Sequence, residues 1–522
     1  MSEPSKLVQA TGAMGLATLA SRVLGLAREI VFAAFLGQSL VASAFFFAFQ
    51  IPNLFRRLLG EGALTAAFIP VFTEKLTKEG AASGQRAANL IGTSLCVVAC
   101  GVTATVIAVL ALASFLFPLS AKTRFILSLT QWMMPYLVFV CMAALSMAVL
   151  NARRHFFVPA LSPILLNIVM IGSVYLFCPR FGHGLQHQVY GLVLGVLLGG
   201  LVQWLYQLPW LWREGFAYRW DFQPKDPVVR RVAGLMWPSV LGVAVFQVNV
   251  ISSGALAFWV GDYARAALNY ADRLMELPMG IFGVSVATYA LPTLATLFAQ
   301  DKIDEFNASL DVSLRLLWFV TIPAAIGLMV LSEPIVALLF ERGNFGPTET
   351  KHAAFALFFL APGLVSYATV NVVARAFYAM QDTRTPMKIG VMAMVVNVFL
   401  AFALMWPLKE GGLALANTLS SSLNAISLFV ALRRRIPGMG GRQLVASALR
   451  TAAPSVMMGI VCWITWKWVS GRLQANSFLS KCELALVPMV AALAVFILVA
   501  GWMGASEWTD VLAAFRRNKI RK

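Results

Sequence analysis

Residues 21–29 read SRVLGLARE and lie inside an apolar run that extends from about Leu7 to Leu36. A run of this length can cross a bilayer, because a spanning helix needs roughly 20 apolar residues at about 1.5 Å each. Two arginines and a glutamate stand in its middle. A charge at the centre of a membrane costs at least about 2.5–3.5 kcal/mol, so it is tolerated only where it faces water or a partner. Two interpretations follow: an arginine-lined cavity for an anionic ligand, or a structural Arg–Glu pair inside a helical bundle.

The composition is that of a membrane protein. Of the 522 residues, 59% are hydrophobic and 12% are charged, whereas soluble proteins carry about 25% charged residues. The apolar runs are long and continuous, which favours helices over a β-barrel, and the N-terminus lacks the pattern of a cleaved signal peptide. The net charge of +18 falls mostly in short loops, so it indicates topology and anionic lipid instead of nucleic acid.

The apolar runs predict an all-α polytopic membrane protein with 14 transmembrane helices. An even number places both termini on one side. The predicted spans lie near 7–36, 40–70, 88–116, 126–150, 158–178, 189–212, 229–260, 264–298, 312–340, 352–379, 386–406, 411–432, 446–470 and 482–503.

Four basic clusters decide the orientation of these spans. They are Arg153-Arg154, Arg230-Arg231, 433–435 and 516–522, and all fall on the same predicted face, together with most of the 41 Lys and Arg. By the positive-inside rule this face is cytoplasmic, with both termini inside. The clusters are interpreted as orientation signals, with binding of lipid headgroups as the alternative.

A weak internal repeat links the first six spans to the next six. Landmarks recur at offsets of about 221–230 residues: 62–70 with 283–292, Pro159 and Asn167 with Pro386 and Asn397, and Gly191-Leu192 with Gly412-Leu413. Copies six spans apart share one orientation, as in transporters with parallel repeats. The sequence therefore predicts two pseudo-symmetric six-helix lobes around a central cavity, and alternating access by rocking of the lobes.

The last two spans lie outside this repeat. The predicted organisation is an N-terminal lobe over 1–213, a cytoplasmic linker over 214–228, a C-terminal lobe over 229–435, an appended helix pair over 436–505 and a basic cytoplasmic tail over 506–522.

The charges of the first span are expected to lie on two faces. Arg22 and Glu29 are seven residues apart and share a face, with Gly25 between them on the same side. Arg28 points roughly 120° away unless the helix bends. Ser21 and Gly25 are the candidate bend points.

The second span is interrupted by Arg56, Arg57 and Glu61, with glycines on both sides of Glu61. This pattern is typical of a broken helix at a gate or cavity wall. The alternative is an interfacial arginine pair that reaches to the membrane surface and has no role with substrate.

The eighth span contains Asp272, Arg273 and Glu276. Arg273 and Glu276 are spaced i,i+3 and can pair locally, and Asp272 and Glu276 are spaced i,i+4. The candidate cations for the cavity are thus Arg22, Arg28, Arg56 and Arg273. Arginine favours a phosphate or pyrophosphate, because its planar fork donates two hydrogen bonds and stays charged when partly desolvated.

Other features carry little chemistry. His183 and His187 are spaced i,i+4 in a predicted external loop without further ligands, and His155 and His352 are interpreted as lone histidines at loop edges. The cysteines lack metal-site spacing, so no metal is expected. The chain has no phosphate-binding loop and no arrangement of nucleophile, base and acid, so a transporter is expected instead of an enzyme.

Four stretches carry a resemblance to a known family: SRVLGLARE at 21–29, NLFRRLLGEGALTAAFIPVF at 53–72, YADRLMELPMGIFGVSVATYALP at 270–292 and AFYAMQDTRTPMKI at 376–389. Together they resemble the MurJ (MviN) lipid II flippases of the multidrug/oligosaccharidyl-lipid/polysaccharide (MOP) exporter superfamily, over essentially the whole chain. The resemblance implies a V-shaped bundle of two lobes in the bacterial inner membrane, with the last two helices forming a groove for the lipid tail. It implies translocation of an undecaprenyl-pyrophosphate-linked peptidoglycan precursor to the periplasmic leaflet.

The resemblance also assigns residues. The family's essential cavity arginines match Arg22, Arg28, Arg56 and Arg273, and its acidic partners, as charge-pairing or gating residues, match Glu29, Glu61, Asp272 and Glu276. One position departs from the pattern: many relatives carry an aspartate where this chain has Ser43. That difference weakens the claim that an acidic residue is needed there in this protein.

No cofactor is implied, and energy is expected from a gradient, either the membrane potential or a monovalent ion. The implied partners are a polyprenyl-pyrophosphate lipid, membrane lipids and proteins of cell-wall synthesis or division. The competing interpretations are a flippase for another polyprenyl-linked glycan, an ion-coupled multidrug exporter, and a non-transporting scaffold of a division complex.

Overall fold

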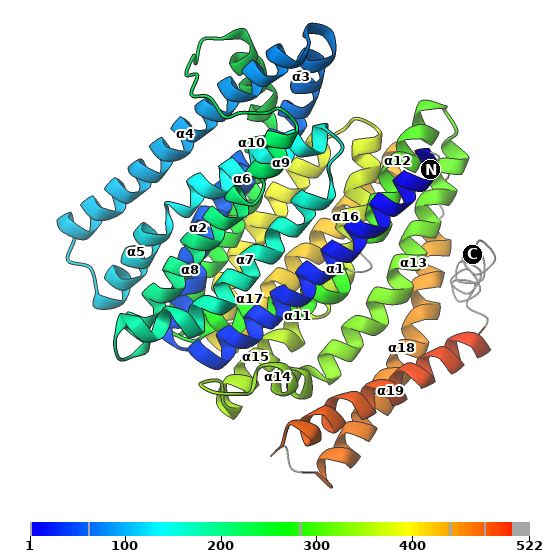
Figure 1. Cartoon of the computed structure of the whole chain (residues 1–522). Coiled ribbons are helices and arrows are strands. Elements are labelled where there is room, and N and C mark those ends of the chain that lie inside the picture. Colours follow the sequence, from blue (N-terminus) through cyan, green and yellow to red (C-terminus); the bar gives the residue numbers. More distant parts are fainter. Residues whose placement is uncertain are drawn as a thin grey trace. The chain divides into compact units, whose positions relative to one another are not determined.

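The computed structural model (Figure 1) describes residues 3–60, 63–280, 284–436, 438, 441–473 and 477–503. Over these ranges the regular structure is helical and contains no strand. The chain divides into two compact units, Met1–Ala255 and Leu256–Lys522. The division falls inside a helix, beyond the predicted linker at 214–228, and the predicted domain boundaries remain predictions.

The first unit contains the helices that cover the first six predicted spans and most of the seventh. They are α1 (Glu3–Leu36), α2 (Leu40–Leu59), α3 (Ala63–Glu79), α4 (Ala81–Leu116), α5 (Ala121–Met133), α6 (Tyr136–Ala152), α7 (Phe157–Leu176), the short 3-10 helix η1 (Cys178–Phe181), α8 (Leu185–Leu205), α9 (Leu208–Arg213) and α10 (Pro227–Val260).

The second unit takes up the chain at the end of α10. Its helices are α11 (Ala264–Pro278), α12 (Val284–Ala299), α13 (Ile303–Val330), α14 (Ser332–Phe340), α15 (Pro347–Leu360), α16 (Gly363–Ala379), α17 (Arg384–Arg435), α18 (Gly441–Ser470) and α19 (Phe478–Trp502).

Each predicted span coincides with one of these helices, with a pair of them, or with one half of α17. Among the described residues, eight helical stretches are long and apolar enough to cross a membrane, and the pair α15–α16, bent by 46°, makes a ninth. The polytopic all-α class is therefore confirmed. α17 covers two predicted spans, and the break between them is at Lys409, whose φ of 50° lies outside the helical region.

One pair of repeat landmarks, Gly191 and Gly412, serves the same purpose in both units. A Cβ at Gly191 would lie 2.6 Å from the backbone of Cys178, and a Cβ at Gly412 would lie 2.1 Å from the carbonyl oxygen of Leu404. In each unit a glycine thus permits close contact with the end of the preceding span. This equivalence supports the pseudo-symmetry predicted from the sequence.

Each unit has its own apolar core. In the first, the buried side chains of α3, α4 and α6 pack together, with Phe68 and Leu137 fully buried. In the second, α12, α13, α16 and the end of α17 share a core. A separate cluster that includes Phe319, Met458 and Phe496 packs α18 and α19 against α13.

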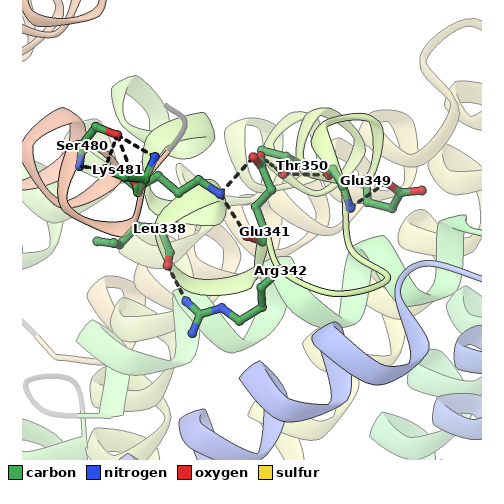
Figure 2. A network of polar contacts seen from close by, with 9 residues as sticks. Leu338, Glu341, Arg342, Glu349, Thr350, Ser480 and Lys481 are labelled. Atoms are coloured by element: carbon green, nitrogen blue, oxygen red, sulfur yellow. Dashed lines mark hydrogen bonds and ion pairs between the residues drawn. The ribbon is translucent and has the colours of Figure 1, made fainter. Parts of the chain in front are cut away.

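A polar network also joins α19 to the rest of the second unit (Figure 2). Lys481 Nζ lies 3.1 Å from Glu341 Oε1 and donates to the Glu341 carbonyl at 3.0 Å. The other carboxylate oxygen of Glu341 accepts from the Thr350 hydroxyl at 2.7 Å. Glu341 therefore joins α19 to the turn between α14 and α15.

Candidate functional site

Arg28 is the best-defined charge of the first predicted cluster. It is 8% exposed and lies where α1 packs on α7. Its Nη2 donates to Glu29 Oε1 at 2.5 Å, and its Nη1 donates to Asn167 Oδ1 at 3.1 Å. Its guanidinium also lies 5.8 Å from the ring centre of Phe32. The guanidinium is therefore held by groups from two helices.

This arrangement differs in detail from the one expected from helix geometry. The sequence predicted that Arg22 and Glu29 share a face and that Arg28 points away. In the structure the long Arg28 side chain reaches its neighbour Glu29, which is 1% exposed. The pair is almost completely shielded from solvent. Removing either charge would therefore leave the other one buried and uncompensated. Among the described residues Arg28 Nε has no hydrogen-bond partner.

Two further residues of the SRVLGLARE stretch, Ser21 and Gly25, face the same amide. Asn167 Nδ2 donates to the Ser21 carbonyl at 3.4 Å, and a Cβ at Gly25 would lie 3.8 Å from that nitrogen, an ordinary contact. α1 continues without a break through both candidate bend points. Arg22 is partly exposed. The sequence indicated Asn167 only as a repeat landmark. Its role could have been found from the position of a polar residue inside an apolar span.

The second cluster ends α2. Arg56 is partly exposed and donates through Nε to Asn53 Oδ1 at 3.1 Å, while Arg57 is exposed. Both lie in the last turn, where a helix dipole favours cations. The helix ends at Leu59, with Gly60 as its C-cap, close to the expected break. Glu61 lies outside the described residues.

The third cluster lies on α11. Arg273 Nη1 donates to Glu276 Oε2 at 2.7 Å, which confirms the predicted i,i+3 pair; their side chains are 38% and 55% exposed. The charges of Arg265, Glu276 and Arg273 act on the carboxylate of Asp272. Sequence reasoning did not single out Arg265, although it precedes Asp272 by seven residues and therefore lies on the same face of the helix.

The described contacts group the candidate cations into separate sets. Arg22 and Arg28 belong to α1 and Arg56 to α2, in the first unit, whereas Arg273 belongs to α11 in the second. Ser43 is fully buried in α2. A common substrate site for the four arginines remains a prediction.

The second unit contains a polar network that the sequence did not indicate. Glu410, 2% exposed, lies 2.6 Å from His352 Nδ1 and accepts from the Tyr263 hydroxyl at 3.0 Å. The His352 and Tyr263 rings are 4.0 Å apart. Burial and the Glu410 carboxylate raise the pKa of Tyr263. The interpretation of His352 as a lone histidine was wrong, because three segments distant in the sequence pack together here.

The same correction applies to His155. Its Nε2 lies 2.7 Å from Glu214 Oε1, and Arg153 lies 4.0 Å from the second oxygen of that carboxylate. Within the described ranges no three His, Cys, Asp or Glu residues gather closely enough to hold a metal ion. Cys178 and Cys482 do not form a disulfide.

The chain is similar in sequence to one known family. The profile of the family described as Lipid II flippase MurJ matches residues 32–482. The "Probable lipid II flippase MurJ" of Vibrio cholerae is 36% identical over 459 residues, covering 85% of this chain and 87% of the relative. The "Lipid II flippase MurJ" of Burkholderia cenocepacia is 32% identical over 492 residues, covering 91% and 93%.

Solved structures extend the comparison to the fold. One described as "Lipid II flippase MurJ, inward closed conformation" superposes with a TM-score of 0.76 at 23% identity, over 96% of this chain and 99% of that one. A MATE family multidrug resistance transporter of the MOP superfamily superposes with a TM-score of 0.65 at 16% identity, over 80% and 94%. These identities carry the fold alone. The family profile and the relatives show that the chain belongs to the MurJ lipid II flippase family, whose members are transporters and not enzymes.

Proposed function

We propose that the chain flips lipid II, an undecaprenyl-pyrophosphate-linked peptidoglycan precursor, from the cytoplasmic to the periplasmic leaflet for cell-wall synthesis. Membership of the family supports the substrate, since curated relatives over most of the chain carry that activity in their names. The protein is proposed to lie in the bacterial inner membrane. The positions of the basic clusters favour a topology with both termini in the cytoplasm.

The observation that carries the proposal is the held guanidinium of Arg28. A buried arginine fixed by Glu29 and Asn167 is already oriented, so it loses little side-chain entropy when it meets an anion. A pyrophosphate offers more negative charge than one carboxylate, so it competes for the guanidinium. Glu29 then acts as the charge that holds Arg28 while no substrate is bound.

The other candidate cations complete the binding of the headgroup. Arg22, Arg56 and Arg273 are all at least partly exposed, which leaves their guanidinium groups within reach of a hydrated ligand. Arg273 is steadied by Glu276, and Asp272 is balanced by Arg265. Glu61 is proposed as a further charge-pairing residue beside Arg56.

Transport follows an alternating-access cycle of the lobes 1–213 and 229–435, joined by the linker 214–228. The headgroup binds the arginines from the cytoplasm, the lobes rock, and the headgroup leaves on the periplasmic side. The polyprenyl tail stays in lipid along the helix pair of 436–505. Because the sequence has no nucleotide motif, the energy comes from the membrane potential, worth about 2.3 kcal/mol per charge at 100 mV, or from a monovalent ion.

A depletion strain tests the proposal. Arg22→Ala, Arg28→Ala and Arg273→Ala should each fail to support growth at normal expression, with build-up of lipid II and loss of its labelling by a membrane-impermeant reagent. Arg124→Ala, an exposed arginine outside the predicted site, is the matched control and should support growth. Growth of the three site variants would refute the cavity role. Build-up of a different polyprenyl-linked glycan would identify another substrate.

A further inference from the structure

The segment 206–231, which runs from the end of α8 through α9 into the first residues of α10, is fixed on one side to α4. The backbone N–H of Arg219 donates to Asn89 Oδ1 at 3.1 Å, and that of Asp221 donates to Thr93 Oγ1 at 3.1 Å. The Tyr218 side chain occupies a niche beside Gly92 of α4. The niche needs a glycine, because a Cβ at position 92 would lie 2.2 Å from the Tyr218 hydroxyl. This segment is therefore a folded part of the first unit and not a loose tether.

The carboxylates of the segment are all engaged by the protein. Glu214 lies 2.7 Å from His155. Asp221 and Asp226 lie 3.9 and 3.8 Å from Arg86. Asp226 also caps the start of α10 by accepting from the N–H of Val228 at 2.8 Å. The negative charges of the segment thus point to protein groups and are partly neutralised there.

Four cations of the same segment form no ion pair among the described residues. Arg213, Arg219, Lys225 and Arg230 are exposed, and the guanidinium of Arg213 lies 4.9 Å from the ring centre of Trp210. Trp212 and Trp220 beside them are 60% and 69% exposed. We call these four cations and two exposed tryptophans the basic loop face; the segment that carries them is held against α4.

The neighbouring helices keep this face close to a bilayer. The apolar span Leu185–Arg213 ends at its first cation, and the predicted seventh span begins at 229, next to its last. Tryptophan is enriched where a membrane meets water, and basic clusters beside spans are attracted to anionic headgroups. The surface that is always within reach of the basic loop face is therefore the lipid headgroup layer.

We propose that the basic loop face binds the phosphate headgroups of anionic phospholipids. The cations supply the attraction and the two indole rings enter the interface. This is a site for membrane lipid apart from the proposed site for the transported substrate, and it does not depend on which glycan is carried. Because the charges are exposed, binding should weaken as ionic strength rises.

The test measures binding of fluorescent phosphatidylglycerol and phosphatidylcholine to the purified full-length protein in mixed micelles. The variant R213Q/R219Q/K225Q/R230Q should lose about ten-fold or more in affinity for phosphatidylglycerol and little for phosphatidylcholine. The variant R213K/R219K/R230K keeps the charge and should bind as the wild type does. The matched control R124Q/R180Q/R342Q/K351Q removes the same charge from exposed positions elsewhere and should also bind normally.

Two results would overturn the proposal. One is unchanged phosphatidylglycerol affinity in R213Q/R219Q/K225Q/R230Q. The other is an equal loss in the control, which would mean that net charge and not this face governs binding. Thermal unfolding of each variant confirms that it is folded, and because all four substituted side chains are exposed, we expect little change in stability.

Discussion

Replacing Lys481 by methionine should weaken the packing of α19 on the rest of the second unit. The two side chains of the Lys481–Glu341 pair are 15% and 17% exposed (Figure 2), so the Glu341 charge would remain largely buried. Breaking a fully buried pair costs ~3–5 kcal/mol. Because some water reaches both groups and Thr350 still donates to the carboxylate, we expect a loss of about 2 kcal/mol in the free energy of unfolding.

A double-mutant cycle isolates this energy. K481M, E341Q and the double variant are unfolded at equilibrium in mixed micelles, and the coupling between the two positions should be about 1–2 kcal/mol. The charge swap E341K/K481E should recover stability, because it restores the pair and places the carboxylate in the first turn of α19, where the helix dipole favours an anion.

Arg342 provides the matched control in the same turn. It is exposed, and among the described residues its guanidinium donates only to the carbonyl of Leu338, so R342Q should change stability by less than about 0.5 kcal/mol. A coupling energy near zero between Lys481 and Glu341, or an equal loss in R342Q, would refute the reasoning. It would mean that the apolar cluster with Phe319 and Phe496 alone holds α19.

The sequence predicted the helices well because long apolar runs and their interruptions are local signals. The end of α2 near Gly60 and the pair Arg273–Glu276 are also local: one follows from charges and glycines within a few residues, the other from i,i+3 spacing. For the same reason the domain scheme and the common arginine site could only be stated as predictions, since they depend on how distant segments meet.

The contacts that the sequence did not reveal are those between distant segments. Asn167 reaches Arg28 across 139 residues, and His352 reaches Glu410 across 58. Such pairs depend on how helices pack, and hydrophobic periodicity says which face is apolar but not which polar group lies opposite. Arg28 was also placed by ideal helix angles, which leave out the reach of its side chain.

Two further predictions concern single positions. G92A should displace Tyr218 from α4 and lower the unfolding temperature, because the added Cβ would lie 2.2 Å from the hydroxyl, whereas G101A, with nothing within 4 Å on the same helix, should not; equal effects would contradict the niche. Asp382 lies 2.6 Å from Arg435, and although partial burial raises its pKa, hydrogen bonds and that guanidinium lower it overall. Its folded pKa is therefore below the unfolded value of about 3.9, so its stabilising effect is present above that pH and is lost as the pH falls through the folded pKa. D382N should remove this part of the acid-induced loss of stability, measured as unfolding temperature between about pH 7 and 3, and an unchanged profile would show that the charge of Asp382 contributes nothing.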